Sequence, residues 1–256
     1  MLANYHTHTY RCGHAFGSDR EYIENAIKHG MKVLGFSDHC PWVFPDDYIS
    51  PTRMSPNDVE EYFSSLTALK KEYADDITIY IGFEAEYIPE LIEEQDKLLA
   101  DYPVDYMILG QHYNAPENTD NFVGRLTRDE NVLKKYVDMV IEGMETGRYR
   151  YIAHPDLVQF VGNDEICIKH YTRLCEYLKE KDIPIEINLL GLSENRHYPS
   201  NVFLRTAMNI GNKAIIGCDA HSPQVLSYEY DIKKCMRVAK LYSLEVIDYL
   251  SGLEPQ

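Results

Sequence analysis

The chain of 256 residues is long enough for a substantial hydrophobic core, and α/β barrels of this size commonly form a single domain, here residues 1–256. Its composition, with 45% hydrophobic and 26% charged residues, excludes a disordered chain, and no apolar run approaches the length of a membrane-spanning helix. The formal net charge of −16 argues against nucleic-acid binding, which needs clustered lysine and arginine.

Seven short apolar runs predict β-strands, and each run ends at or beside a His, Glu, Asp or Asn. In chain order the runs are Met1–Tyr5, Val33–Phe36, Ile77–Phe83, Tyr106–Leu109, Tyr149–Ala153, Ile183–Ile187 and Lys213–Gly217. Helix-like segments separate them, from Ser18 to about His29, Ser55 to about Tyr73, Pro89 to near Asp101, Thr127 to near Gly147, Asn163 or Asp164 to Lys181, Ser200 to about Gly211, and Gln224 to about Lys240. Strands alternating with helices imply a parallel sheet, closed or doubly wound. Seven such units favour a closed, somewhat irregular barrel.

Capping residues mark several of the predicted helix boundaries. The segments Ser18–Glu21 and Thr127–Glu130 each have the pattern of a capping box, and Gly30 is a stop signal after the first helix. Ser55 followed by Pro56 is typical of a helix start. We also expect a helix over Ser243–Leu250 at the end of the chain.

The polar residues at the strand ends predict one polynuclear metal site, because a parallel βα barrel places the carboxyl ends of its strands on one face. His6 and His8 are two positions apart on a strand, so both imidazoles point to the same side, and His14 follows on the next loop. The later strand ends add His39, Glu84, His112, His154, Asp219 and His221.

Some of these polar residues have more than one interpretation. Glu84 is our candidate for a carboxylate bridging two metals, with Glu86 as the alternative. Asp38 and Asp156 are each a ligand or a partner that orients an imidazole. Three other histidines, His29, His170 and His197, are interpreted as solvated or hydrogen-bonded side chains.

The six cysteines form no C-x-x-C pair and no disulfide-like framework. We interpret them as small buried side chains in a reducing compartment, although Cys12, Cys40 and Cys218 lie next to candidate ligands. The first residues enter an apolar run without the basic region of a secretion signal, which predicts a cytoplasmic protein.

The order H-x-H-x(5)-H, D-H, E, H, H, D-x-H closely resembles the PHP (polymerase and histidinol phosphatase) superfamily, over almost the whole chain. The segment HTHTYRCGHA at His6–Ala15 is similar to the histidinol-phosphatase branch. The resemblance implies a distorted (β/α)7 barrel with three metal ions. The implied ligands are His6, His8, Glu84 and Asp219 for the first ion, Glu84, His112 and His154 for the second, and His14, His39 and His221 for the third.

Imidazole and carboxylate ligands suit zinc, iron or manganese, and the sequence does not select among these three divalent metals. Two ions sharing Glu84 would lie about 3.5–4 Å apart, and a hydroxide between them would attack a phosphate monoester directly. No Ser, Cys or Asp nucleophile is then needed. The catalytic candidates are Glu84, Asp219 and His221, and the proton donor for the leaving group stays open between a metal-bound water, Asp219 and His221.

The segment after the sixth strand contains the candidate substrate contacts. The resemblance implies that Arg196 binds the phosphate, with a solvated loop charge as the alternative. A second arginine often found in the family after the H-P-D motif is replaced here by Leu157–Val161, so Arg53 or Arg11 would have to substitute. Asn188 either binds substrate or is a structural amide at the strand end.

The expected reaction is hydrolysis of L-histidinol phosphate to L-histidinol and phosphate, a step of histidine biosynthesis. The expected partner is a small phosphate monoester, with neither nucleic acid nor membrane, and the sequence does not indicate the oligomeric state. A PHP-type nucleotide phosphatase or exonuclease is the alternative within the superfamily, and a metal-storage protein without turnover is the alternative outside enzymes. Amidohydrolases and TatD-type deoxyribonucleases also begin with H-x-H, but they do not account for His14, His39 and His221 together.

Overall fold

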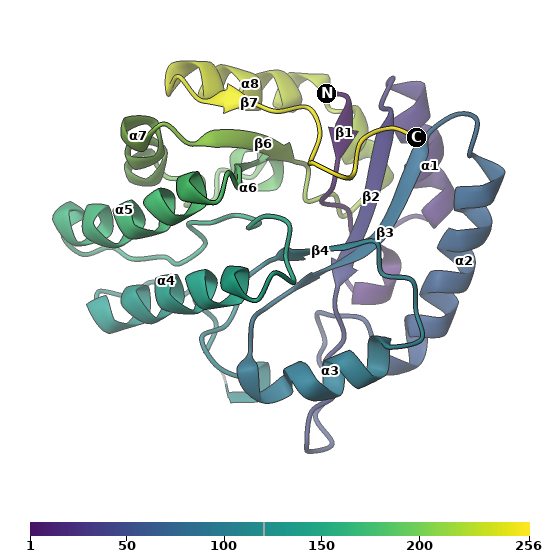
Figure 1. The fold of residues 1–256 in the computed structure, drawn as a ribbon, viewed down its shortest axis with the longest axis horizontal. Helices are drawn as coiled ribbons and strands as arrows, with labels where there is room; N and C mark the ends of the chain where they lie inside the picture. Colours follow the sequence, from purple (N-terminus) through teal and green to yellow (C-terminus); the bar gives the residue numbers. More distant parts are fainter. Residues whose placement is uncertain (120) are drawn as a thin grey trace.

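A parallel β-barrel forms the centre of the computed structural model, which describes residues 1–119 and 121–256 (Figure 1). One sheet contains β1 (Ala3–Asn4), β2 (Val33–His39), β3 (Thr78–Ala85) and β4 (Tyr106–Leu109), in this order. The other sheet contains β5 (Ile185–Asn188), β6 (Lys213–Gly217) and β7 (Glu245–Val246). All neighbouring strands in both sheets run parallel.

Isolated parallel bridges join the two sheets into a closed ring. Ile152 bridges to Leu109 on one side and to Ile185 on the other, and Thr7 bridges to Ala220 on the opposite side of the barrel. The predicted fifth strand is therefore reduced to one bridging residue, because the chain turns at His154 (φ 31°) and proline follows. With this exception, the predicted seven-stranded (β/α) barrel is confirmed.

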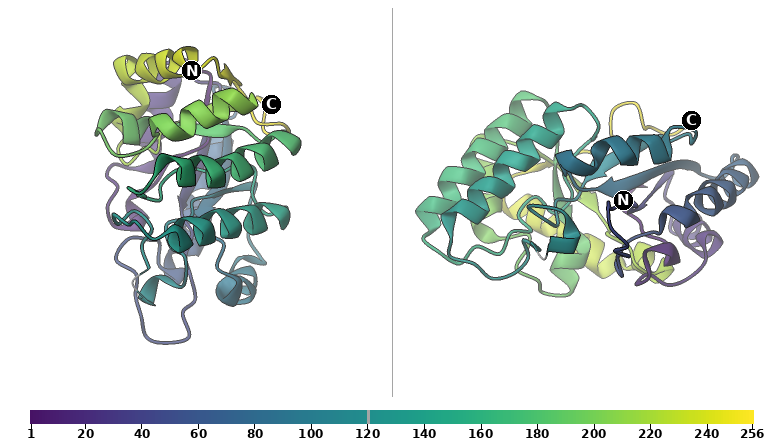
Figure 2. Two further views of the ribbon diagram at one scale, coloured as in Figure 1. Left: turned by 90° about the vertical axis from the view of Figure 1, so that its left-hand side faces the viewer. Right: turned by 90° about the horizontal axis from the view of Figure 1, so that it is seen from below.

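Helices cover the outside of the barrel (Figures 1 and 2). They are α1 (Asp19–Lys28), α2 (Val59–Glu72), α3 (Ile92–Leu99), α4 (Glu130–Glu145), α5 (Asp164–Glu180), α6 (Leu189–Ser193), α7 (Asn201–Ile210) and α8 (Glu229–Leu241). Short 3₁₀ turns add η1 (Tyr10–Cys12), η2 (Pro56–Asp58), η3 (Pro89–Leu91), η4 (Glu117–Thr119) and η5 (Pro223–Ser227). Within the described residues, none of the helices combines the length and the apolar character that crossing a membrane requires.

The capping prediction is right for the first helix and wrong for the fourth. Ser18 and Glu21 form the predicted reciprocal capping box. Thr127 is instead paired with Phe160 in a parallel bridge, so α4 begins later, with Asp129 as its N-cap. The structure also contains α6, a short helix that the pattern did not predict.

The predicted helix over Ser243–Leu250 is wrong. Ser243 has a positive φ of 50°, which ends helical geometry, and β7 follows at once. The Ile247 N–H then donates to the Ala214 carbonyl, so the segment extends the sheet beside β6. Pairing with an exposed strand edge satisfies backbone groups that an isolated helical turn would leave open.

Aromatic side chains fill the barrel interior below the carboxyl ends of the strands. Tyr106 reaches across from β4, and its hydroxyl donates to the carbonyls of Tyr5 (2.9 Å) and Phe36 (3.2 Å). Gly35 and Gly82 leave the space for this ring, since a Cβ at either position would lie within 3 Å of Tyr106 atoms. The barrel is thus a packed core at one end, and the polar site is confined to the other.

Candidate metal centre

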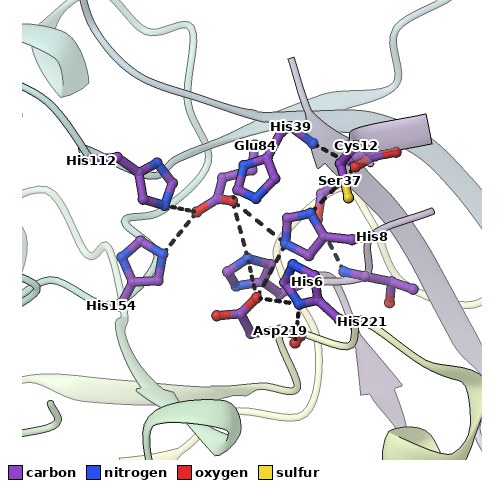
Figure 3. A network of polar contacts seen from close by, with 12 residues as sticks. His6, His8, Cys12, Ser37, His39, Glu84, His112, His154, Asp219 and His221 are labelled. Atoms are coloured by element: carbon purple, nitrogen blue, oxygen red, sulfur yellow. Dashed lines mark hydrogen bonds and ion pairs between the residues drawn. The ribbon is translucent and has the colours of Figure 1, made fainter. Parts of the chain in front are cut away.

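The nine predicted ligands gather at the carboxyl ends of the strands, and Figure 3 labels all of them except His14. They come from the segment after β1 (His6, His8, His14), from β2 (His39), β3 (Glu84), the loop after β4 (His112), the turn after Ile152 (His154), and the loop after β6 (Asp219, His221). Elements far apart in the sequence therefore supply one cluster, as the parallel topology requires.

The side chain of Glu84 lies at the centre of the cluster and is 1% exposed. Its Oε2 atom lies 3.5 Å from Nε2 of His6, 3.5 Å from Nε2 of His8 and 3.1 Å from Nδ1 of His39. The other oxygen faces a different pair of imidazoles.

Oε1 of Glu84 lies 2.9 Å from Nε2 of His154 and 3.6 Å from Nε2 of His112. Gly110 makes this approach possible, because a Cβ at that position would lie 1.9 Å from Oε1. A carboxylate with one oxygen toward each of two imidazole sets has the geometry of a bridging ligand, which is the role predicted for Glu84.

Asp219 and the third histidine set complete the cluster. Asp219 Oδ1 lies 3.5 Å from Nε2 of His6 and 3.2 Å from Nε2 of His8. His14 and His221 approach each other with their Nε2 atoms 3.0 Å apart, and one ring nitrogen each of His14, His39 and His221 lies within 4.8 Å of the others. The predicted third ligand set is thus brought together.

The unpaired buried atoms of the cluster and their spacing fit divalent metal ions. In the described part of the chain, Nε2 of His6, Nε2 of His8 and both oxygens of Glu84 are buried without a hydrogen bond. Unpaired buried groups of this kind cost about 1–3 kcal/mol each, so a ligand is expected. Ligand atoms about 3.4 Å apart match the edge of a tetrahedron around an ion with bonds of about 2.1 Å.

Burial keeps two of the imidazoles in the neutral form that metal ligation requires. It lowers the pKa of His39 to about 3, and it lowers the pKa of His221 well below the ordinary value. Both side chains can therefore offer a lone pair at neutral pH.

Three imidazoles are oriented from behind by buried carboxylates. Nδ1 of His6 lies 2.9 Å from Glu186, and Nδ1 of His112 lies 3.0 Å from Glu86. Nδ1 of His8 faces Asp38 at 3.4 Å. Such partners fix the tautomer and leave Nε2 free for a metal. This geometry places Asp38 behind the His8 imidazole and Glu86 between the His112 imidazole and Arg53, whereas Glu84 has the central position.

Glu186 is the functional residue that the sequence reasoning missed. It is fully buried and accepts hydrogen bonds from His6, from the backbone N–H of His154 (2.8 Å), from the Tyr151 hydroxyl (3.2 Å) and from Asn188 (2.8 Å). The available signal was a charged residue inside an apolar strand run, two positions before Asn188 and on the same side of the strand.

Asn188 also lies beneath the cluster. Its side chain is fully buried, donates to Glu186 and to Asp219 (3.2 Å), and accepts from the backbone N–H of Gly191 (2.8 Å). This environment is that of the structural strand-end amide weighed from the sequence. Asp156 has a comparable structural contact, because it accepts from the backbone N–H of Ser200.

The histidines interpreted as non-ligands lie in other interactions. His29 contacts the Asn25 carbonyl, His170 contacts Glu130, and His197 contacts the Leu157 carbonyl. All six cysteines are buried and free, as expected, although Cys12 Sγ lies near ring nitrogens of His8 and His221.

The three candidate arginines all pair with carboxylates, but they differ in how deeply they are buried. Arg11 is buried and paired with Asp19 and Glu61, and Arg53 is buried and paired with Glu86 and Glu117. Arg196, on the loop after α6, is 42% exposed in its side chain, lies 2.7 Å from Glu194 and donates to the Tyr198 hydroxyl.

A cavity of about 630 Å³ opens over the cluster. Its floor includes His39, His112, His154, Asp219 and His221, and its walls include Arg196 together with the aromatic side chains Phe16, Tyr113, Phe122, Tyr198 and Tyr228. The cavity is within the usual size range of small-ligand sites.

A parallel barrel with clustered imidazoles and carboxylates beneath an open cavity defines the class of metal-dependent barrel enzymes. The chain belongs to the PHP domain family, whose match covers residues 4–189. It is 27% identical over 235 residues to a probable histidinol-phosphatase of Deinococcus radiodurans, with 90% of each chain covered. It is 26% identical over 269 residues to the histidinol-phosphatase of Bacillus subtilis, with 90% of this chain and 98% of that protein covered.

Two solved structures have the same fold. Histidinol phosphate phosphatase of Lactococcus lactis, in complex with zinc, L-histidinol and phosphate, matches with a TM-score of 0.72 at 19% identity, over 100% of this chain and 98% of that chain. A putative histidinol phosphatase of Listeria monocytogenes matches with a TM-score of 0.71 at 21% identity, over 90% and 99%.

Substitution of Glu186 tests whether the buried carboxylates behind the imidazoles support metal binding. In Glu186→Gln the side chain keeps its shape but loses the charge that holds His6 and the His154 backbone, so we expect metal affinity to fall about 10- to 100-fold. Metal content after dialysis against a chelator measures this. The exposed Glu176→Gln on α5 is the control, and equal metal retention in both variants would contradict the role.

Metal binding should depend on pH through His8. Although burial alone would lower its pKa, the adjacent carboxylates of Asp219 and Asp38, 3.2 and 3.4 Å from its ring nitrogens, raise the pKa of His8 to about 9 in the metal-free protein. At pH 7 a proton must therefore leave before a metal binds, and affinity should increase as the pH rises toward 9. Calorimetric titration in buffers of different ionisation enthalpy measures the released proton. An affinity that stays constant from pH 7 to 9 would count against this coupling.

Proposed function

We propose that the protein hydrolyses phosphate monoesters, with L-histidinol phosphate as substrate and L-histidinol and phosphate as products, as a step of histidine biosynthesis. The observation that carries the proposal is the buried Glu84, whose two oxygens face separate imidazole sets. Above it lies an open cavity that His39, His112 and His154 line together with Arg196. The histidinol-phosphatases among its relatives support the substrate, since the chain aligns with them over most of their length.

We assign three divalent ions, zinc, iron or manganese, to the nine clustered residues. The first ion would be held by His6, His8, Glu84 and Asp219, the second by Glu84, His112 and His154, and the third by His14, His39 and His221. When bound, such ions supply positive charge to the phosphate and a water acidic enough to act as nucleophile near neutral pH.

The chain's own residues bind and orient the ester. Arg196 offers a planar guanidinium to two phosphate oxygens, and the Tyr198 hydroxyl, 2.9 Å from Nη1, steadies it. Asp219 lines the cavity, and although burial opposes ionisation, His6 and His8 hold its pKa well below the usual range. As an ionised carboxylate it is placed to accept a proton from the attacking water rather than to donate one.

The cavity walls suit a cationic, aromatic alcohol as the leaving group. Tyr113, Phe122 and Tyr228 present flat apolar surfaces, and Glu194 contributes a carboxylate at the same cavity. An imidazole ring and an ammonium group both find complementary partners there. Phosphate, ring and amine would thus be recognised by different walls of one cavity.

The open cavity and the charge of the chain favour the proposal over the alternatives. A storage protein needs closed coordination, whereas here six of the nine cluster residues line an accessible cavity, namely His14, His39, His112, His154, Asp219 and His221. A nuclease needs a basic track for the backbone, and the formal net charge is −16.

A substrate panel tests the proposal directly. Metal-loaded protein should release phosphate from L-histidinol phosphate with a higher kcat/KM than from nucleoside monophosphates, and it should leave single-stranded DNA intact. Comparable efficiency on every monoester would reduce the function to a general phosphatase. Nucleotide release from DNA would favour the exonuclease, and the absence of any turnover would favour storage.

Arg196→Gln should weaken phosphate recognition in particular. Loss of a charged hydrogen bond costs about 1.5–3 kcal/mol, so we expect kcat/KM for L-histidinol phosphate to fall about 10- to 100-fold with metal content unchanged. The surface variant Arg20→Gln, which breaks an exposed pair with Glu72, is the matched control. Steady-state kinetics with unchanged KM and kcat would remove Arg196 from the site.

A further inference from the structure

Arg53 is a buried cation held between two buried carboxylates. Its side chain is 4% exposed, those of Glu86 and Glu117 are 2% and 4% exposed, and both ion pairs are short, at 2.9 Å and 2.6 Å. Nη1 also donates to the Cys40 carbonyl at 2.9 Å, directly after β2. These contacts engage all three guanidinium nitrogens and balance the charge of Arg53 with two carboxylates, so its main role is inside this network although it lines the cavity.

Glu86, one of the two carboxylates, contacts the predicted metal ligand His112. Oε1 of Glu86 receives Arg53 Nη2 at 2.9 Å and faces Nδ1 of His112 at 3.0 Å, while Oε2 receives the Trp42 indole N–H. The carboxylate therefore keeps Nδ1 of His112 protonated and turns Nε2 toward Glu84 (Figure 3).

The other carboxylate leads to the loop between β2 and η2. Oε2 of Glu117 receives Arg53 Nε, and Oε1 accepts from the hydroxyls of Ser50 (2.6 Å), Tyr48 (3.2 Å) and Thr52 (3.4 Å). Residues 46–52, here called the β2–η2 loop, form no helix or strand. Thr52 and Arg53 at its end belong to the cavity wall.

We propose that Arg53 is a positioning residue that couples the β2–η2 loop to the metal ligand His112, through Glu117 on one side and Glu86 on the other. Metal binding at His112 then orders the loop, and the ordered loop strengthens metal binding, because a coupling between two sites acts equally in both directions. The proposal concerns metal affinity and loop order, so it is independent of which phosphate ester the protein hydrolyses.

Hydrogen exchange of the wild-type protein with and without zinc measures the effect of metal binding on the order of the β2–η2 loop. We expect peptides that contain residues 46–52 to exchange more slowly in the zinc-loaded protein, and we expect this difference to disappear in Arg53→Lys and in Glu117→Gln. Lysine keeps the charge, but its single nitrogen cannot occupy the three positions from which Nε, Nη1 and Nη2 of Arg53 reach Glu117, the Cys40 carbonyl and Glu86.

Competition with a chelator measures the effect of the ordered β2–η2 loop on metal affinity. We expect Arg53→Lys and Glu117→Gln to bind zinc about 10- to 100-fold more weakly at one site, with the other sites unchanged. Arg148→Lys is the matched control, since Arg148 is a partly buried arginine paired with Asp96 on α3. We expect Arg148→Lys to keep wild-type zinc affinity.

Two results would overturn the proposal. One is loop exchange in the wild-type protein that does not respond to zinc, and the other is wild-type zinc affinity in Glu117→Gln. If Arg53→Lys fails to fold by circular dichroism, both tests still apply to the wild type and to Glu117→Gln, which removes one charge at the loop end of the network and leaves Arg53 and Glu86 in place.

Discussion

The site depends on a single buried anion, the carboxylate of Glu84. Removing such a group from water costs several kcal/mol unless opposite charges and hydrogen-bond donors surround it. Strand register supplies part of this environment, because Glu84 is the direct neighbour of His39 on β2 and of Ile108 on β4. Gly110, one residue beyond β4, then leaves the space that Oε1 occupies. Moving the register by one residue would turn Glu84 out of the barrel and dismantle both imidazole sets.

Further carboxylates support the imidazoles around Glu84, so negative charge is concentrated at one end of the barrel. Asp38, Glu86 and Glu186 each face an Nδ1 atom, and all three are buried. Together with Glu84 and Asp219 they form an acidic centre that Arg53 only partly neutralises. Bound divalent ions would be the largest local charges and would reverse the local potential, which reconciles a chain of net charge −16 with an anionic substrate.

The sequence allowed the fold and the nine clustered residues to be predicted because both depend on strand ends, where an apolar run meets a polar residue. It did not identify Glu186, because a carboxylate inside a strand has no such boundary signal, and its role emerges only from contacts with His6 and the His154 backbone. The sequence pattern also predicts helix where the short β7 lies, because that strand forms only through pairing with a distant segment. Its pairing partner is β6, about 30 residues away, whereas helical patterns are read locally.

The proposal that Arg196, and not Arg11 or Arg53, binds the phosphate is supported by the unequal cost of freeing each arginine from its carboxylates. Arg11 and Arg53 are held by carboxylates in buried pairs, and breaking such a pair leaves an uncompensated charge at a cost of about 3–5 kcal/mol. Arg196 is paired with Glu194, and both side chains are about half exposed. Exposed pairs are worth about 0–1 kcal/mol, so a phosphate can replace Glu194 on Arg196 at little expense. The released Glu194 carboxylate would then be available to an ammonium group on the same substrate. Each charge of the Arg196–Glu194 pair would thus gain an opposite charge from the substrate.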